Sequence, residues 1–360
     1  MTPVRTALPR AATAFSLDEA LSATEPPEAR GVARDNVRLL VASASGVRHT
    51  LFRSFAEHLA PGDLVVVNTS GTLAAAVDGT RSRSSGRDVT AHFSTRLDDG
   101  TWLVEFRPAV DATGPLTDIV AGEQIVLVGG ATLIPLGPGP SAPDRPSRLW
   151  RTTVLLPASP ATNIVGYLGR NGRPIIYAYV RGQFPLADYQ TVFAGDPGSA
   201  EMPSAGRPFT TRIVTDLATR GVTVAPITLH TGVSSLEEGE PPLPEPYSVP
   251  PTTARLIEQT RRYGGRVVAV GTTVTRALET VARADGTVVA GAGWTDLVLG
   301  PDRPARVVDG LVTGWHAPGA SHLLLLEAVA GQALVASAYA GALAERYRWH
   351  EFGDSCLLLP

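Results

Sequence analysis

The sequence predicts a large mixed α/β domain that is interrupted by a small antiparallel β-barrel. Apolar, strand-like runs alternate with helical patterns at the start of the chain and again after Pro160. Between residues 71 and 157 the pattern changes to short β-rich runs separated by Gly, Pro, Asp and Ser. A chain of 360 residues is long enough for two domains. We therefore expect residues 1–70 and 158–360 to form a discontinuous α/β domain, and residues 71–157 to form the inserted barrel.

The first elements along the chain read as a short α/β segment followed by the barrel. Residues 38–42 and 64–68 predict strands, residues 51–59 predict a short helix, and residues 61–63 (Pro-Gly-Asp) predict a turn. Regularly spaced short strands with turn signals between them are typical of small antiparallel barrels. We expect the barrel strands at residues 89–93, 102–107, 124–128, 131–136 and 149–155, with a Pro/Gly/Ser loop at residues 137–147.

Helix and strand patterns alternate again in the second half of the chain. The elements predicted there are helices at residues 211–220, 252–263 and 273–283, one or two more at residues 322–348, and strands at residues 222–229 and 266–270. Gly221 and the pair Gly264-Gly265 end the first two helices. Residues 237–251 are acidic and rich in proline, which predicts an exposed loop.

Residue counts exclude several classes of chemistry. Cys356 is the only cysteine in the sequence, which therefore allows neither an intrachain disulfide nor a thiolate metal cluster. The sequence contains no lysine, which means that all 31 basic residues are arginine. This excludes a Schiff-base lysine and a Walker-type phosphate-binding lysine. The seven histidines include no His-x-His or i,i+4 pair, so we predict no metal site.

Charge and hydropathy bear on location and partners. No apolar run approaches the ~20 residues of a membrane helix, and residues 1–24 lack the apolar core of a secretory signal. We expect a cytoplasmic protein with no membrane partner, either a monomer or a homodimer. The net charge of −3 predicts no strong nucleic-acid surface. Local basic clusters are either solvated loops or phosphate contacts: Arg81, Arg83 and Arg87; Arg145, Arg148 and Arg151; Arg170, Arg173 and Arg181.

The clearest local signal for a ligand site is the turn Gly271-Thr272-Thr273, where a buried strand runs into a helix. Gly271 permits a tight turn, and a threonine at the helix N-cap leaves backbone N–H groups for an anion or a hydroxyl-rich group. Ligands of open α/β sheets bind beyond the carboxyl ends of such strands. The same pattern also occurs in helices that are merely well capped.

Two charged residues share one face of the helix that follows this turn. Arg276 and Glu279 are three residues apart, and on an exposed face they would form an ordinary surface ion pair. On a face that looks into the cleft, Arg276 would hold a carboxylate. Glu279 would then accept hydrogen bonds from ribose hydroxyls or act as a base.

Two histidines follow predicted strands. His230 closes the strand at residues 222–229, and His316 stands just before Pro318. A lone histidine is more often structural, but two imidazoles at strand ends are candidates for proton transfer. A further polar motif, Gly-Trp-Thr-Asp at residues 293–296, contributes Trp294 and Asp296.

Taken in order, these segments resemble one family, the S-adenosylmethionine:tRNA ribosyltransferase-isomerases of queuosine biosynthesis. The resemblance runs nearly from end to end of the chain. It rests on residues 34–35, 38–41, 61–68, 188–194, 198–199, 205–206, 209–210, 228–232, 265–279, 293–296, 308–309, 316, 318, 347–348 and 353–354.

The resemblance implies an α/β domain with an inserted barrel, S-adenosylmethionine (SAM) as a substrate, and neither a metal nor a redox cofactor. In the implied reaction, the sulfonium acidifies the C5′ hydrogens and a base forms an ylide. Adenine and methionine then leave as the amine of 7-aminomethyl-7-deazaguanine in tRNA is alkylated and an epoxide closes. The implied catalytic candidates are His230, His316, Glu279 and Asp296. The implied substrate-binding candidates are Asn68, Tyr189, Gln190, Gly206, Gly271, Thr272, Thr273, Arg276 and Trp294.

The sequence also departs from the family pattern. Thr69-Ser70-Gly71 stand where the family carries Asp, Thr and Arg, and Arg207-Pro208 stand where it carries Leu-His. Residues 237–240 are acidic where the family carries Lys and His, and residues 174–180 and 314–318 also differ. The motifs that we associate with the donor change less than those that we associate with the acceptor.

Three functions therefore stay open. The first is the family reaction on tRNA. The second is a paralogue that consumes SAM with a small-molecule acceptor, or in an elimination or cyclisation. The third is a protein that binds SAM without catalysis. Release of adenine distinguishes the enzymes from the silent binder, and a requirement for tRNA distinguishes the first two.

Overall fold

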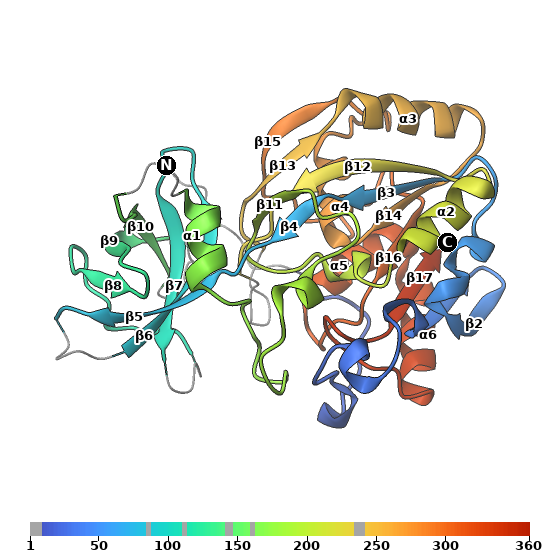
Figure 1. The fold of residues 1–360 in the computed structure, drawn as a ribbon. Helices are drawn as coiled ribbons and strands as arrows, with labels where there is room; N and C mark the ends of the chain where they lie inside the picture. Colours follow the sequence, from blue (N-terminus) through green and yellow to red (C-terminus); the bar gives the residue numbers. More distant parts are fainter. Residues whose placement is uncertain (1–8, 84–87, 110–113, 141–146, 159–162, 234–241) are drawn as a thin grey trace.

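The computed structural model describes residues 9–83, 88–109, 114–140, 147–158, 163–233 and 242–360. Within these residues, nine strands form one mixed sheet in the order β15-β13-β12-β3-β14-β16-β17-β1-β2 (Figure 1). In that order the strands are Gly291–Thr295, Glu245–Val249, Thr223–Leu229, Leu64–Asn68, Val267–Val270, Gly310–Thr313, Ser355–Leu359, Arg38–Ser43 and Gly46–Leu51. The central strands β12, β3, β14 and β16 run parallel to one another.

Both faces of this sheet are buried, because apolar side chains alternate along its strands. In β3, Leu64 and Val66 belong to the core on one face, while Val65 and Val67 belong to the core on the other. The first face packs against α3 (Pro251–Arg262), α4 (Thr272–Thr280), α5 (His322–Ala330) and α6 (Gln332–Ala344). The second packs against α2 (Thr211–Thr219) and the 3₁₀ helix η4 (Phe52–His58).

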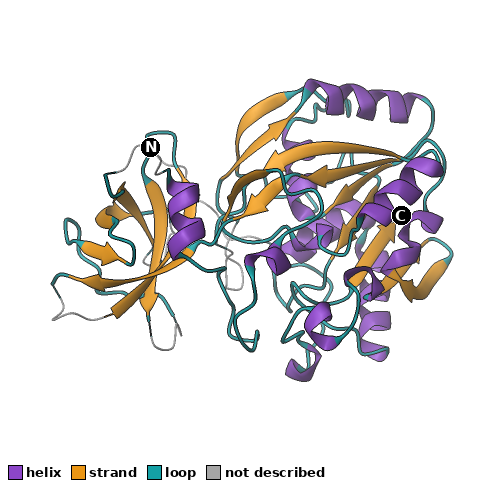
Figure 2. Cartoon of the chain, in the orientation of Figure 1, coloured by secondary structure: helices purple, strands orange, loops and turns teal. Residues whose placement is uncertain are grey.

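A second unit, the predicted β-barrel, stands apart from the large sheet (Figure 2). Within the described part of the chain it is a closed barrel in the order β10-β7-β6-β5-β8-β9. The strands are β5 (Ala76–Arg81), β6 (Asp88–Arg96), β7 (Trp102–Pro108), β8 (Ile125–Leu127), β9 (Thr132–Pro138) and β10 (Leu149–Leu155), and α1 (Ile164–Asn171) packs beside β5. The fold class is therefore confirmed, whereas domain boundaries at residues 70/71 and 157/158 remain a prediction.

A short two-stranded sheet lies where the chain leaves the large sheet for the barrel. β4 (Ser70–Thr72) pairs in parallel with β11 (Asp196–Ser199). Two 3₁₀ helices flank β11, namely η5 (Leu186–Tyr189) and η6 (Ser204–Gly206). These segments form one wall of the site described below.

Several elements differ from the sequence prediction. Residues 46–51 form a strand, and residues 245–249 form β13 within the predicted acidic loop, whose residues 237–241 lie outside the described part of the chain. α4 ends at Thr280 and not near residue 283. The predicted C-terminal helical region is two helices that meet at Gly331, where φ is 77°, with a bend of 119°. In the described residues no single helix is long and apolar enough to span a membrane, although the α5–α6 pair meets that test together.

Four of the seven described arginines in the predicted basic clusters form ion pairs. Arg81 is buried and pairs with Glu123 and Asp118, so it is not available to a phosphate group. The remaining described ion pairs in these clusters are Arg148–Glu105, Arg151–Asp99 and Arg173–Asp78. Arg87 and Arg145 lie outside the described residues. Carboxylates of the protein therefore neutralise part of the positive charge of these clusters.

Candidate functional site

The main cavity lies at the carboxyl ends of the parallel strands β14 and β16. Its volume is about 460 Å³. The turn after β14 contributes Gly271, Thr272 and Thr273, and the turn after β16 contributes residues 313–318. Residues from α5, from the segments around η5 and η6, and from the turn at residues 350–351 complete the walls. This is the position at which open α/β sheets bind their ligands.

Asn68 holds together the strand ends next to the cavity. Its side-chain oxygen accepts hydrogen bonds from the backbone N–H groups of Leu229 (3.0 Å) and Ser70 (3.0 Å), and its amide donates to the Leu229 carbonyl (2.9 Å). The amide also lies 3.4 Å from the Thr273 hydroxyl. Asn68 is buried and is not among the residues that line the cavity, so it positions the Thr273 turn.

The N-terminus of α4 opens into the cavity without a side-chain cap. The N-cap residue is Gly271 and not a threonine, so the cap residue has no side chain to accept a hydrogen bond from the first turn. Gly271 has φ 93°, a conformation that favours glycine, and an added Cβ would lie only 3.3 Å from the Ala205 Cβ. The uncapped N–H groups and the helix dipole together favour a negatively charged group of a ligand.

Two stacked histidines line the same cavity. The rings of His316 and His322 are 4.5 Å apart and 3° from parallel. Burial, together with the neighbouring His322, holds the pKa of His316 well below its usual value. Burial, together with Arg276, lowers the pKa of His322 to about 4. Both imidazoles are therefore neutral near pH 7, and each is able to accept a proton.

The hydrogen bonds of His316 favour one tautomer. The Thr313 hydroxyl donates to the Gly314 carbonyl (3.1 Å) and lies 3.0 Å from His316 Nε2. Because this hydroxyl proton is already used, the arrangement is satisfied when Nε2 carries the hydrogen and donates it to Thr313. His316 Nδ1 is then the basic atom of the ring.

His230 does not line this cavity. Its Nδ1 is 2.7 Å from the Ser70 hydroxyl, which is 2.6 Å from the Ser199 hydroxyl, and its Nε2 is 3.7 Å from Asp196. Burial lowers the pKa of His230. The ring links β12 to the short β4–β11 sheet, which is a structural role. A catalytic role for His230 remains a prediction.

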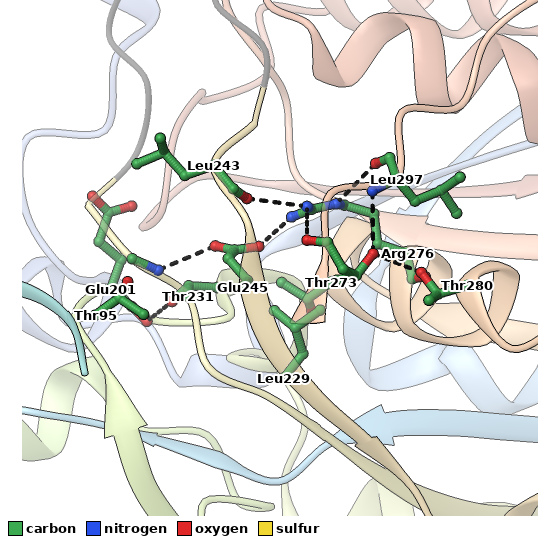
Figure 3. A network of polar contacts seen from close by, with 12 residues as sticks. Thr95, Glu201, Leu229, Thr231, Leu243, Glu245, Thr273, Arg276, Thr280 and Leu297 are labelled. Carbon is green, nitrogen blue, oxygen red and sulfur yellow. Dashed lines mark hydrogen bonds and ion pairs between the residues drawn. The ribbon is translucent and has the colours of Figure 1, made fainter. Parts of the chain in front are cut away.

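Arg276 is engaged within the protein (Figure 3). Its guanidinium forms an ion pair with Glu245 and donates to the carbonyls of Leu243 (3.2 Å), Thr295 (3.1 Å) and Leu297 (3.3 Å). A smaller cavity of about 100 Å³ adjoins it and shares Thr272, Thr273 and His322 with the main cavity. A methionyl carboxylate would have to replace Glu245 or use the remaining N–H of Arg276.

Glu279 faces away from Arg276 and from the cavity. Its carboxylate is buried and accepts hydrogen bonds from the backbone N–H groups of Arg306, Val307 and Val308, at 2.8–3.1 Å. Arg303 adds an ion pair at 3.5 Å. This position fixes the chain ahead of β16 and does not support the catalytic role that the sequence suggested for Glu279.

Asp296 and Trp294 also lie outside the cavity. Asp296 is exposed. The Trp294 indole N–H donates to the Asp98 carboxylate (3.0 Å) in the turn between β6 and β7, which joins the barrel to the edge of the large sheet. The structure thus places the Gly-Trp-Thr-Asp motif at a contact between the two units.

The remaining candidates lie around η5 and η6. Tyr189 is buried and lines the cavity. The side chain of Gln190 accepts from the Thr72 N–H (3.0 Å) and donates to the Thr72 carbonyl (2.8 Å), so it ties η5 to β4. Gly206 is buried next to Thr191, with 3.3 Å between an added Cβ and the Thr191 methyl group. Gln190 and Gly206 support the cavity wall and do not line it.

The lining residues that sequence reasoning missed include six with titratable side chains. They are Tyr177, Tyr179, Glu201, His322, His350 and Glu351. Each lies in a segment that carries no ligand-binding pattern of its own, and the fold alone brings them together. The only available signal was that some of them fall in segments that depart from the family pattern.

Among the described residues, no group of three or more His, Cys, Asp and Glu side chains is placed to hold a metal ion.

The fold and the cavity define an α/β enzyme that holds its substrate at the carboxyl ends of parallel strands, next to an inserted β-barrel. The family model described as "Queuosine biosynthesis protein" matches residues 11–358. The chain belongs to this family.

Relatives named S-adenosylmethionine:tRNA ribosyltransferase-isomerase span almost the whole chain. The protein of Symbiobacterium thermophilum is 36% identical over 354 residues, which cover 96% of this chain and 98% of the relative. The Thermotoga maritima protein is 33% identical over 352 residues, with the same coverage. The crystal structure of S-adenosylmethionine tRNA ribosyltransferase from Thermotoga maritima matches with a TM-score of 0.51 and 28% identity, over 96% of this chain and 99% of that one.

Proposed function

We propose that this protein transfers and isomerises the ribosyl group of SAM onto tRNA that carries 7-aminomethyl-7-deazaguanine. The observation that carries the proposal is the full-length family match, from residue 11 to residue 358, with relatives named for this activity. A cavity of suitable chemistry at the carboxyl ends of the parallel strands supports it.

The N-terminus of α4 is the place for the carboxylate of the methionyl group. Gly271, Thr272 and Thr273 line the cavity, and the first turn of the helix has no side-chain cap. Backbone N–H groups at a helix N-terminus bind carboxylates without a basic side chain. This suits a cavity whose described lining contains no arginine.

His316 is the candidate for the base that removes a C5′ proton. Its Nδ1 is free to accept a proton when Nε2 donates to Thr313, and burial keeps the ring neutral at pH 7. The sulfonium acidifies the adjacent C5′ hydrogens, so transfer of one of them to Nδ1 leaves an ylide and an imidazolium.

The experiment supplies SAM together with tRNA that carries the aminomethyl base, and follows adenine, methionine and the mass of the modified nucleoside. The proposal expects adenine and methionine in equal amounts, with a matching gain of an epoxide-bearing ribosyl group on the nucleoside. SAM that binds without adenine release would identify a silent binding protein instead.

A second candidate is the same donor chemistry with a small-molecule acceptor. The ion pairs of Arg81, Arg148 and Arg173 favour it, because they reduce the positive charge available to a tRNA backbone. Release of adenine at full rate without RNA, in the presence of a small amine, would support this candidate over tRNA.

A further inference from the structure

One wall of the cavity combines two carboxyl groups with a stack of aromatic rings. The rings of Tyr177 and Tyr179 stack at 5.7 Å, and those of Tyr179 and His350 stack at 4.1 Å. The Tyr177 hydroxyl donates to Glu201, and the Tyr179 hydroxyl donates to Glu351. All five side chains line the main cavity. We call this group, with Tyr189, the acidic corner.

Tyr189 supplies an independent sign that a ligand belongs here. Its ring is 3% exposed, yet its hydroxyl has no hydrogen-bond partner among the described residues. A buried hydroxyl without a partner costs free energy, so such groups in native proteins call for an explanation. Burial, together with the negative charge of Glu351, raises the pKa of Tyr189, so the phenol keeps its proton. A ligand in the cavity would satisfy it.

The acidic corner therefore offers acceptors for a protonated amine. An alkylammonium group has three N–H donors. Two carboxyl groups and the Tyr189 hydroxyl oxygen supply hydrogen-bond acceptors. No arginine is among the described residues that line this cavity, so positive charge there comes from the ligand.

We propose that Glu201, Glu351 and Tyr189 bind the protonated amine of the acceptor, and that Glu351 takes one of its protons before the amine attacks the ribosyl group. The proton moves from nitrogen to the carboxylate, which leaves a neutral amine with a free electron pair and a protonated Glu351. The inference rests on the proposed function, because it assigns the acceptor subsite of that reaction.

The surroundings of Glu351 suit this transfer. Burial raises the pKa of Glu351 to about 7, against a hydrogen bond from Tyr179 and the positive charge of Arg207, which both lower it. The other titratable groups nearby are the Tyr189 phenol and the adjacent His350, whose pKa is lowered by burial. His350 has φ 71°, a left-handed conformation that is costly for a residue with a side chain. That strained turn presents Glu351 to the cavity.

The test compares two free bases that differ by one amino group, 7-aminomethyl-7-deazaguanine and 7-methyl-7-deazaguanine. We expect the wild-type protein with SAM bound to prefer the amine by about tenfold or more, as a charge-assisted hydrogen bond would give. Glu351→Gln and Tyr189→Phe should lose most of this preference and keep the SAM affinity of the wild type. The matched control is Glu345→Gln, an exposed position at the end of α6, which should change neither.

The source of the amine is tested by repeating the comparison with the two bases placed in an anticodon stem-loop RNA. A preference seen only in the RNA identifies a tRNA-borne amine, and one seen with the free bases identifies a small molecule. The proposal is wrong if the wild-type protein does not prefer the amine, either as a free base or in RNA. Adenine release in the same experiment would still support the proposed function. It is also wrong if Glu351→Gln weakens SAM binding about tenfold and keeps the preference, because the carboxylates then hold the donor. Preference without adenine release would leave the subsite intact and refute the proposed function.

Steady-state kinetics test the proton transfer. In the wild type, kcat/KM for the acceptor should rise as the pH increases through about 7, because Glu351 loses its proton. Glu351→Gln should lose this limb of the profile. An unchanged limb in the variant would contradict the proton-transfer part.

Discussion

The rings of His316 and His322 stack face to face at 4.5 Å, within 3° of parallel, and both line the cavity that also contains the N-terminus of α4. Two protonated imidazoles at this separation would repel each other, and burial lowers both pKa values. The pair therefore stays neutral at physiological pH. It thus provides a neutral imidazole that can accept a proton without the help of a metal ion or a lysine.

We expect His316→Asn to slow adenine release from SAM by 10²–10⁴-fold, the usual contribution of a general base. SAM affinity should change little, because the proposed contact develops only in the transition state. His49→Asn, at an exposed position on β2, is the matched control. Adenine release and calorimetry on the same preparations make the comparison. Full activity in His316→Asn would assign the base to another residue, and His322 in the same cavity would be the next candidate.

Arg276→Ala should lower the stability of the fold more than it lowers SAM affinity. The guanidinium is 7% exposed and pairs with Glu245, and removing one partner of a buried ion pair costs about 3–5 kcal/mol. Thermal unfolding and calorimetry with SAM separate the two effects. A variant that keeps its melting temperature but loses about 1.5–3 kcal/mol of SAM affinity would instead support the carboxylate clamp.

Glu351→Gln should stabilise the protein at pH 8 and have little effect at pH 4. The folded-state pKa of about 7 lies above the ordinary 4.5, so the fold favours the protonated carboxyl group. Its stabilising contribution is present below pH 4.5 and is lost as the pH rises through 7. The gain at pH 8 is at most about 3 kcal/mol. Unfolding of wild type, Glu351→Gln and Glu345→Gln across this range checks it, and a pH-independent difference would contradict the raised pKa.

Binding of tRNA should depend only weakly on salt. Each phosphate neutralised by a protein contributes a slope of roughly −0.7 to −0.9 to log K against log salt. Arg81, Arg148 and Arg173 already pair with carboxylates of the barrel or its edge, and the net charge is −3. We expect a slope near that of one or two contacts, measured across a salt series. A slope of many units would contradict this prediction, because it would show that the protein binds several phosphate groups despite these ion pairs.

The parts of the site that follow from local sequence were predictable. The Gly271-Thr272-Thr273 turn was predicted because a buried strand, a glycine and a helix start are adjacent in the chain, and Gly271 and both threonines do line the cavity. Even there the threonine cap was wrong, because glycine itself is the N-cap. The fold class followed in the same way from the change in hydrophobic period near residues 71 and 157.

The parts that depend on distant contacts were not predictable. Arg276 and Glu279 share a helix by sequence, yet Arg276 turns to Glu245, which is 31 residues away, and Glu279 binds the chain 27–29 residues further on. β5 was missed because Asp78 and Gly79 interrupt its pattern. A side chain at Gly79 would meet the Val126 carbonyl at 2.7 Å, and Asp78 is paired by Arg173 from outside the barrel.

A crystal structure of this protein with SAM bound would test the roles of the α4 N-terminus and of His316 most directly. We expect SAM in the cavity of about 460 Å³, with its methionyl carboxylate at the N-terminus of α4 and its C5′ atom within van der Waals reach of His316 Nδ1. SAM bound elsewhere on the protein, or held in the cavity with C5′ turned away from the His316–His322 pair, would contradict it.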